Sequence, residues 1–460
     1  MFAKTITAIT AAKTVRLFLR IFGGGATAAP GLVAERIDPT ILSRLTSRLP
    51  KKVIITGTNG KTTTSRILST ILSFNGIKTI HNREGSNLTR GIVSTLIEKS
   101  NLLASSEADI GVFEVDEATL PEAVSKINPD VIVINNLFRD QLDRYGEVNK
   151  IHKRWSEVLA NLPSNTTIIL NSDDPSVAEL GNSTKAKTLY FGIEDEKMSL
   201  LRLSHASDFI SCLSCGYELK FDHIYLSHLG KYLCNNCGLK RPKPTYFAHS
   251  IKFLGSEGSV AKINTPQGRF DISAQIPGLY NLYNIIAAVT AAISLGIKVE
   301  NIEKSLRDYK SAFGRAEKLE INDKSIFVFL AKNPTGFNEV IRTVFWDKER
   351  KNVFLIINDL IADGTDVSWL WDVDFELLKH KVDQVWVSGL RAADMSLRLK
   401  YADIAVDSSN VNEDIEESLD QALKKLKTGE TLYIFPTYTA LLNLQKILRS
   451  KKVTGAFWEN

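Results

Sequence analysis

The chain has 460 residues, 44% of them hydrophobic and 24% charged, with a formal net charge of +5. This length favours two or three domains with large buried cores, and the composition is that of an ordinary soluble globular protein. The mild positive charge is compatible with anionic substrates. It is not the footprint of a nucleic-acid-binding protein, so we expect no nucleic-acid partner. No apolar run approaches the length of a membrane span.

The N-terminal segment, residues 1–38, begins with apolar side chains interleaved with Lys4, Lys13, Arg16 and Arg20. These charges interrupt any signal-peptide core. The pattern fits a basic amphipathic helix that rests on anionic lipid, which would give the protein a peripheral contact with the membrane. It also fits a helix packed on the domain surface, and the broad apolar face favours this second interpretation.

A glycine-rich turn follows a predicted strand at 53–56 and leads into a helical pattern. Backbone N–H groups at such a turn face an anion, Lys61 adds a positive charge, and the hydroxyl of Thr62 or Thr63 can ligate Mg²⁺. The standard P-loop pattern has glycine at the position of Ile55, so this is a shorter form of the motif. The turn predicts binding of a nucleoside triphosphate, the alternative being a plain surface turn. Its residues are Gly57, Thr58, Asn59, Gly60, Lys61, Thr62 and Thr63.

Beyond this turn, strand-like runs alternate with helical patterns, which argues for a parallel sheet of βαβ units with ligands at the carboxyl ends of the strands. A second α/β series follows a predicted hinge at 310–315. The runs of the first series lie at 53–56, 110–115, 131–135 and 167–170, followed by β-like runs at 248–253, 259–263 and 270–276 and a helix at about 281–295. The runs of the second series lie at 326–330, 353–357, 384–388 and 432–435.

All four cysteines form one pattern, in which two Cys-x2-Cys pairs are separated by eighteen residues. Four thiolates at this spacing favour a closed tetrahedral Zn²⁺ site, which would stabilise a small ribbon that lacks a core of its own. The alternative, two disulfides or four unrelated thiols, fits poorly because we expect no secretion signal. The predicted ligands are Cys212, Cys215, Cys234 and Cys237, within an insert at 205–244.

Polar residues follow two of the predicted strands. Glu114 lies near the end of the strand at 110–115, where a carboxylate can hold Mg²⁺ directly or through water. A denser polar run begins at Asn136, directly after the strand at 131–135. Because the carboxyl ends of parallel strands meet at one edge of the sheet, these clusters and the phosphate turn together predict a metal–nucleotide site.

Five segments resemble, in order, the central domain of Mur ligases and folylpolyglutamate synthases: the phosphate turn, 136–143, 170–175, 277–288 and 314–317. In that family ATP phosphorylates a carboxylate, and an amine then attacks the acyl phosphate. By position, the residues that the resemblance assigns are Lys61 to the phosphates, Thr62 and Glu114 to Mg²⁺, Asn281 and Asn284 to the adenine, and Arg315 to the phosphates from the domain junction.

Two departures from that family bear on the metal site and the acceptor. Gln141 stands within 140–143 where the family has a histidine, so a second-metal ligand is missing. The ATP domain starts near residue 40, which leaves no room for the N-terminal domain with which Mur ligases grip a UDP-sugar. We therefore expect an acceptor other than a soluble UDP-linked precursor.

The zinc insert, residues 330–338 and residues 358–372 are similar to those of the MurT subunits of lipid II isoglutaminyl synthases, and this resemblance spans essentially the whole chain. It implies ATP-dependent amidation of the D-glutamate α-carboxylate of lipid II to D-isoglutamine in peptidoglycan synthesis, in the cytoplasm at the inner face of the plasma membrane. Ammonia would come from a glutaminase subunit, GatD, in a heterodimer. An aspartate of the C-terminal domain would complete the Cys–His pair of that subunit. The candidates are Asp359, Asp363 and Asp366, of which we favour the last two.

The predicted fold class is α/β, with a central Mur-ligase-type ATP-binding domain at 39–313 that carries the zinc ribbon, and a smaller C-terminal α/β domain at 314–460. The predicted cofactors are ATP, Mg²⁺ and structural Zn²⁺. A stand-alone ligase that adds an amino acid, as folylpolyglutamate synthases do, is an alternative that the missing histidine and the zinc insert disfavour. A zinc-ribbon ATPase that binds nucleic acid is a second alternative, which the scattered charge disfavours.

Overall fold

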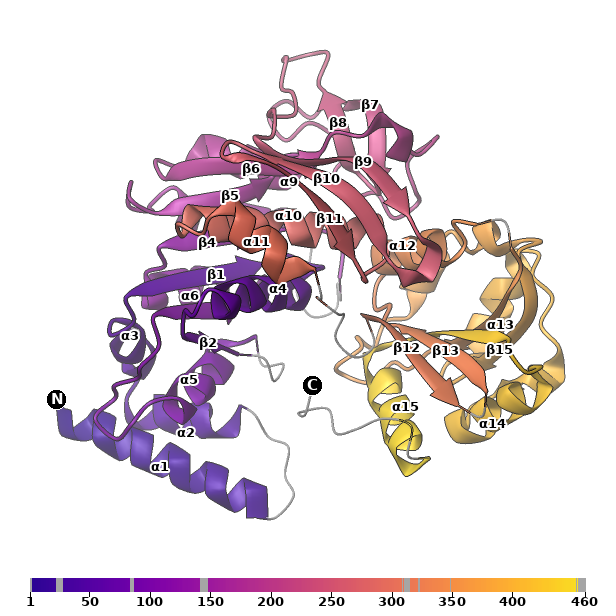
Figure 1. Ribbon diagram of the computed structural model, residues 1–460, viewed down its shortest axis with the longest axis horizontal. Helices are drawn as coiled ribbons and strands as arrows, with labels where there is room; N and C mark the ends of the chain where they lie inside the picture. Colours follow the sequence, from indigo (N-terminus) through magenta and orange to yellow (C-terminus); the bar gives the residue numbers. More distant parts are fainter. Residues whose placement is uncertain are drawn as a thin grey trace.

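The computed structural model describes residues 2–21, 28–82, 87–140, 148–307, 309, 315–321, 323–347, 349–451 and 453. Two α/β bodies lie side by side, each built on its own sheet, and a two-stranded ribbon projects from the first (Figure 1). None of the helices within these residues combines the length and the apolar character that crossing a bilayer requires. The predicted hinge at 310–315 falls almost wholly outside the described residues.

The first sheet has nine strands in the order β11-β10-β9-β6-β5-β4-β1-β3-β2. Neighbours from β9 through to β2 run parallel, whereas β9, β10 and β11 pair antiparallel. All seven predicted runs are present as strands, with ends shifted by at most two residues, and β2 and β6 are additional. The strands are β1 (Lys51–Thr56), β2 (Thr79–His81), β3 (Ile110–Glu114), β4 (Val131–Ile134), β5 (Thr167–Asn171), β6 (Lys187–Ile193), β9 (Tyr246–Phe253), β10 (Ser259–Thr265) and β11 (Gly268–Ala274).

Helices cover both faces of this sheet, because successive side chains of a buried strand point to opposite sides. In β1, Val53 and Ile55 join one apolar cluster and Ile54 joins the other. One face carries α4 (Lys61–Phe74), α10 (Leu279–Ser294) and α11 (Val299–Leu306). The other carries α3 (Ile41–Thr46), α5 (Thr89–Glu98), α6 (Leu120–Ile127), α8 (Val148–Leu159) and the short α9 (Pro175–Glu179).

The N-terminal helix α1 (Phe2–Ile21) packs against α2 (Ala29–Ile37) and α5. Its buried side chains include Ala8, Ile9 and Ala12. This agrees with the interpretation of a helix packed on the domain surface. The carboxyl end of α1 nevertheless leaves three large apolar side chains exposed, Leu17, Phe18 and Ile21.

The ribbon consists of the antiparallel strands β7 (Lys220–Leu226) and β8 (Leu229–Leu233) with the two cysteine turns at its outer end. Its own apolar cluster is small, and it includes Cys212 and Cys234. Arg241 fixes the ribbon to the first sheet, because its guanidinium bonds to buried Asp173, to Glu194 and to the Ile193 carbonyl.

The second sheet has six strands in the order β12-β13-β17-β14-β15-β16, all parallel except the β12–β13 pair. Helices again cover both faces, α12 and α13 on one and α14 and α15 on the other. All four strands predicted in this half are found. The elements are β12 (Arg315–Ile321), β13 (Lys324–Phe329), α12 (Pro334–Val344), β14 (Lys351–Ile356), β15 (Val382–Ser388), α13 (Ala392–Tyr401), β16 (Val411–Asn412), α14 (Ile415–Lys425), β17 (Thr431–Pro436) and α15 (Tyr438–Ser450).

Candidate active site

The predicted phosphate turn lies between β1 and α4, at the carboxyl edge of the first sheet. Gly57 and Gly60 have φ angles of +132° and +87°, which L side chains rarely adopt. A Cβ at Gly60 would also lie 1.9 Å from Asn284 Oδ1. The turn therefore requires glycine, and it directs the first N–H groups of α4, which have no partner within the helix, towards the cavity.

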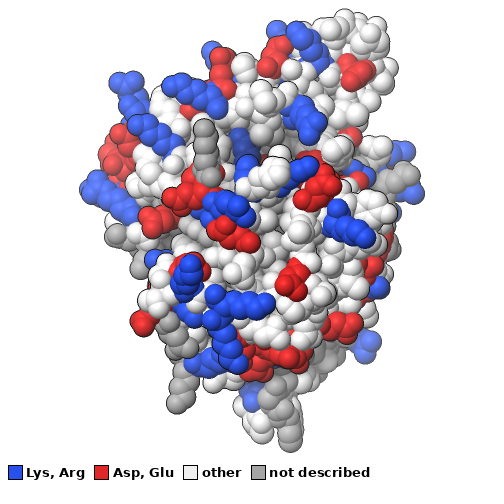
Figure 2. Space-filling view, turned by 90° about the vertical axis from the view of Figure 1, so that its right-hand side faces the viewer, with Lys and Arg blue, Asp and Glu red and all other residues white. Residues whose placement is uncertain are grey.

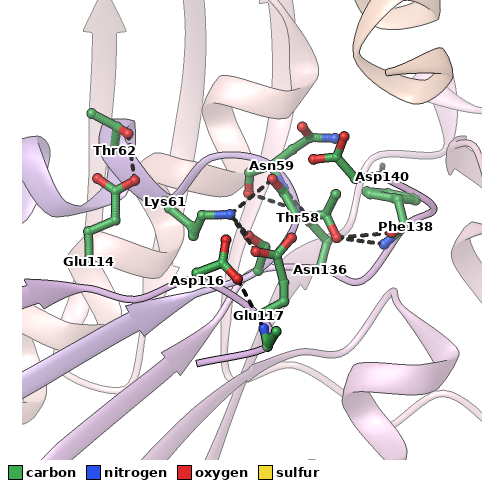
Figure 3. Close-up of polar contacts among 12 residues, drawn as sticks. Thr58, Asn59, Lys61, Thr62, Glu114, Asp116, Glu117, Asn136, Phe138 and Asp140 are labelled. Carbon is green, nitrogen blue, oxygen red and sulfur yellow. Dashed lines mark hydrogen bonds and ion pairs between the residues drawn. The ribbon is translucent and has the colours of Figure 1, made fainter. Parts of the chain in front are cut away.

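Lys61 is buried and ion-paired in this turn. Its Nζ lies 2.8 Å from Glu117 Oε2 and donates to the Gly57 carbonyl at 2.6 Å (Figure 3). Burial by itself would lower the pKa of Lys61, but Glu117 and Asp116 raise that pKa above its ordinary value. Burial likewise opposes ionisation of Glu117, yet Lys61 lowers its pKa. The side chain is thus an ammonium whose partner is a carboxylate.

A hydroxyl and a carboxylate come together beside the turn. Thr62 Oγ1 donates to Glu114 Oε1 at 2.9 Å, as Figure 3 shows. Asp116 and Glu117 lie two and three residues after Glu114 in the chain, and all three carboxylates line the same cavity as Lys61. Oxygen ligands of this kind fit Mg²⁺ beside phosphates. The polar run after β4 also reaches the turn, since Asn136 Oδ1 accepts from the Asn59 N–H at 2.8 Å.

Asn281 and Asn284 lie at the start of α10 and line the cavity, but their hydrogen bonds are made within the protein. Asn284 Oδ1 accepts from Thr64 Oγ1 at 3.3 Å, and its Nδ2 donates to Asn281 Oδ1 at 3.3 Å. Asn281 Nδ2 in turn donates to the Pro277 carbonyl at 2.7 Å. These amides therefore fix α10 against the phosphate turn. Their predicted contact with adenine stays a prediction.

The cavity has a volume of about 510 Å³ and lies between the two α/β bodies and the ribbon. The sequence indicated the phosphate turn, Glu114, the polar run from Asn136, and Asn281 with Asn284, all of which contribute to the lining, but not the other walls. Those walls come from the ribbon, from the end of β13 and the loop after it, and from α12 and α15. They include Leu226, Leu229, Phe329, Lys332, Glu339 and Tyr438. Leu226 and Leu229 belong to the predicted insert at 205–244 and Lys332 to the segment 330–338, but none of these wall residues was predicted individually.

Polar contacts close the junction around this cavity. Lys332 pairs with Asp140, and Asn333 Nδ2 donates to Asn59 Oδ1 at 3.1 Å. Arg342 of α12 donates to the carbonyls of Tyr225 and Met198. Gln141 and the side chain of Arg315 lie outside the described residues, so the second-metal position and the predicted phosphate contact of Arg315 stay predictions.

The three candidate aspartates follow β14 and differ in their surroundings. Asp359 pairs with Arg391. Asp363 is buried and accepts from the Thr439 N–H at 2.8 Å and from the Leu360 N–H at 3.2 Å, and burial raises its pKa. Asp366 accepts from the Ser368 N–H at 2.8 Å, which lowers its pKa. Asp363 therefore holds its loop against the start of α15, whereas Asp366 is exposed.

The four cysteine sulfurs cluster at the outer end of the ribbon. They lie within 4.8 Å of one another, with 3.6 Å between Cys212 and Cys237 and 3.5 Å between Cys215 and Cys234. These separations exceed the roughly 2.05 Å of a disulfide. They are close to the edge of a sulfur tetrahedron around Zn²⁺ with bonds of about 2.3 Å. The donor set therefore fits the predicted ion.

Curated relatives match nearly the whole chain. Subunit MurT of the lipid II isoglutaminyl synthase (glutamine-hydrolyzing) of Staphylococcus aureus strain COL is 34% identical, covering 95% of both chains. The subunit of the same name from Streptococcus pneumoniae strain R6 is 31% identical, covering 98% of both. The chain belongs to the MurT family. Residues 330–441 match the family described as MurT ligase C-terminal, and residues 55–238 match the Mur ligase middle domain, so the resemblance stated from the sequence is confirmed.

Solved structures show the same fold as this MurT-family chain. A pseudomurein peptide ligase type C from Methanothermus fervidus superposes with a TM-score of 0.67 at 24% identity, covering 87% of this chain and 79% of that one. A MurF ligase from Thermotoga maritima, solved in complex with ADP, has a TM-score of 0.63 at 15% identity, with coverages of 91% and 84%. The predicted α/β fold of the Mur ligase type is therefore confirmed, and Mur ligases as a family use ATP and Mg²⁺.

Proposed function

We propose that this chain is the ligase subunit of a lipid II isoglutaminyl synthase. The names of its relatives support this, and the observation that carries it is the cavity, in which the phosphate turn faces a C-terminal domain of the MurT family. An oxygen of the D-glutamate α-carboxylate of lipid II attacks the γ-phosphorus of ATP, and ADP leaves. Ammonia then attacks the acyl carbon, phosphate leaves with a proton from the nitrogen, and D-isoglutamine forms.

The residues of the turn would act by positioning and by neutralising charge. Lys61 and the N–H groups of Gly57–Thr63 hold the β- and γ-phosphates, and Arg315 reaches them from the junction. Thr62 and Glu114 are the proposed Mg²⁺ ligands, supported by their hydrogen bond beside the turn. A bound Mg²⁺ would neutralise phosphate charge during transfer. The division into 1–38, 39–313 and 314–460 is part of the same proposal.

The proposed partner is the glutaminase GatD, which supplies ammonia by hydrolysing glutamine. Large apolar side chains are exposed next to the candidate aspartates. Leu360 and Ile361 directly follow Asp359 in the chain. Leu390 lies close by, because its main-chain N–H donates to Oδ1 of Asn358, the residue before Asp359. Such a surface suits a permanent partner. Figure 2 shows charges of both signs dispersed over the face that includes the C-terminal domain. Asp366 is the best placed of the three to reach a partner's histidine, because Asp363 is bonded to α15 and Asp359 is paired with Arg391.

The four cysteines are proposed to hold a structural Zn²⁺. The protein is proposed to act in the cytoplasm at the inner face of the plasma membrane, where lipid II is accessible as substrate. The exposed end of α1 supports a peripheral contact there, since Leu17 and Phe18 stand beside the largely exposed Arg20.

The test is amidation of lipid II by the purified chain with MgATP. Ammonium salt alone should give slow conversion, and glutamine should support it only when GatD is added. Lys61→Ala is the inactive control. No amidated product with GatD present would end the proposal. The folylpolyglutamate-synthase-like alternative predicts turnover with glutamate as the amine.

A further inference from the structure

One buried carboxyl oxygen in the wall of the cavity has no hydrogen-bond partner among the described residues. Glu339, on α12, is 5% exposed, and its Oε2 is buried without any hydrogen bond. Among the described residues, the cation within ion-pair distance is Arg342, at 3.8 Å from Oε1. The guanidinium of Arg342 already donates to two main-chain carbonyls. Because a buried carboxyl oxygen without a hydrogen bond is costly, Glu339 is suited to a partner that arrives with a ligand.

The helix α12 places Glu339 at a definite distance from the phosphate turn. Asn333, which caps α12, bonds to Asn59 of that turn. Six residues at about 1.5 Å each put Glu339 roughly 9 Å further along the helix axis. There α12 faces α10 and the ribbon, since a Cβ at Gly278 would lie 2.6 Å from Thr343 Oγ1, and Arg342 bonds to the Tyr225 carbonyl.

This end of the cavity has the character of a site for a nucleotide base. Its walls include the apolar side chains of Leu226, Leu229 and Val340 and the ring of Tyr280. A flat ring fits between such walls, and only the edge of the ring needs polar partners. Asn281 and Asn284 use their amides within the protein. Glu339 Oε2 is a buried acceptor without a hydrogen bond in the wall of the described cavity, and it can therefore take a donor from the edge of a bound ring.

We propose that Glu339 selects adenine by accepting a hydrogen bond from its exocyclic 6-amino group. The inference rests on the proposed function, namely that ATP binds in this cavity with its phosphates at Lys61. A neutral carboxyl would in addition donate to the ring nitrogen N1, giving a two-bond match to the adenine edge. Burial, only partly opposed by Arg342, raises the pKa of Glu339 to about 7, so the neutral form is accessible.

The experiment compares ATP with purine riboside 5′-triphosphate, which is ATP without the 6-amino group. Binding of both to the full chain is measured by titration calorimetry with Mg²⁺. The unmodified chain should prefer ATP by about tenfold or more, because a buried acceptor left unpaired disfavours the analogue. Glu339→Met, similar in length but without an acceptor, should abolish the preference by weakening ATP alone. Glu339→Gln should keep it, because its amide oxygen still accepts.

Glu349→Met is the matched control, since the side chain of Glu349 on the same domain is 81% exposed and should leave both affinities unchanged. The inference is overturned if the unmodified chain binds both triphosphates equally, or if Glu339→Met weakens both by the same factor. If Glu339→Met fails to fold, the other two proteins decide. A preference for ATP over the analogue in both the unmodified chain and Glu339→Gln supports the inference, and the loss of that preference in either protein overturns it. If the unmodified chain binds neither triphosphate, the proposed function itself fails.

Discussion

The ion pair between Lys61 and Glu117 gives the sharpest prediction, because both groups are almost completely buried. Glu117→Gln keeps the size of the side chain and removes its charge. Removing one partner of a buried pair costs about 3–5 kcal/mol. The Gly57 and Thr58 carbonyls still accept from Lys61 Nζ, so we expect about 3 kcal/mol. At roughly 2–4 °C per kcal/mol, the ligand-free chain should lose about 6–12 °C in Tm by scanning fluorimetry.

Nucleotide binding should offset part of this loss. When ADP binds, its phosphates become the partner of Lys61, and Glu117 no longer competes for the ammonium. If about half of the 3 kcal/mol is recovered, ADP should bind about tenfold more tightly to Glu117→Gln. The titration is done without Mg²⁺, so that a metal contact by Glu117 does not contribute.

The matched control is Glu122→Gln on α6, where an exposed pair with Lys126 at i,i+4 is worth only about 0.3–0.5 kcal/mol. Its Tm and its ADP affinity should stay close to those of the unmodified chain. An unchanged Tm in Glu117→Gln, or an ADP affinity that is equal or weaker, would refute the reasoning that Lys61 exchanges a carboxylate for a phosphate.

Three further predictions concern other residues. The pKa of Glu339 is about 7 in the folded chain against about 4.5 in the unfolded chain, so the folded state holds more protons and the unmodified chain loses stability as the pH rises between these values. Glu339→Gln has no such group, so its Tm should rise relative to that of the unmodified chain between pH 5 and 8. A Tm difference that does not depend on pH would contradict this. Cys234→Ser should lower bound zinc, measured by mass spectrometry, from one ion per chain to less than half, and undiminished zinc would exclude the cluster as the site. Asp366→Asn should lower glutamine-dependent amidation at least tenfold while ammonia-dependent amidation persists. Asp363→Asn should mainly lower the Tm. Unchanged glutamine-dependent turnover in Asp366→Asn would exclude Asp366 from the shared triad.

Most strands could be predicted because buried parallel strands leave continuous apolar runs in the sequence. Val131–Ile134 is four such residues, all buried. The short β2 and β16 leave no comparable run, since three and two residues are too few to establish a pattern. The order of the strands could not be read locally either, because the pairing of β6 with β9 spans the whole ribbon insert.

Some residues of the candidate site could be predicted from the sequence and others could not. Gly57 and Gly60 could be recognised because a backbone conformation restricts the residue type directly. Glu117 and Glu339 could not be recognised from the sequence, since the importance of each depends on neighbours that only the folded chain places beside it. Asn284 shows the converse. It was predicted to face the adenine, which stays a prediction, and the structure adds that its amide oxygen accepts from Thr64 beside the turn.

The two ends of the ribbon have different surroundings. Its residues Leu226 and Leu229 line the cavity, while its cysteines lie at the opposite end. The ribbon has only a small apolar cluster, so its order depends on what holds each end. Arg342 of α12 bonds to the Tyr225 carbonyl at the cavity end. The ribbon thus forms a wall of the cavity that is bonded to both α/β bodies, through Arg241 to the first and through Arg342 to the second.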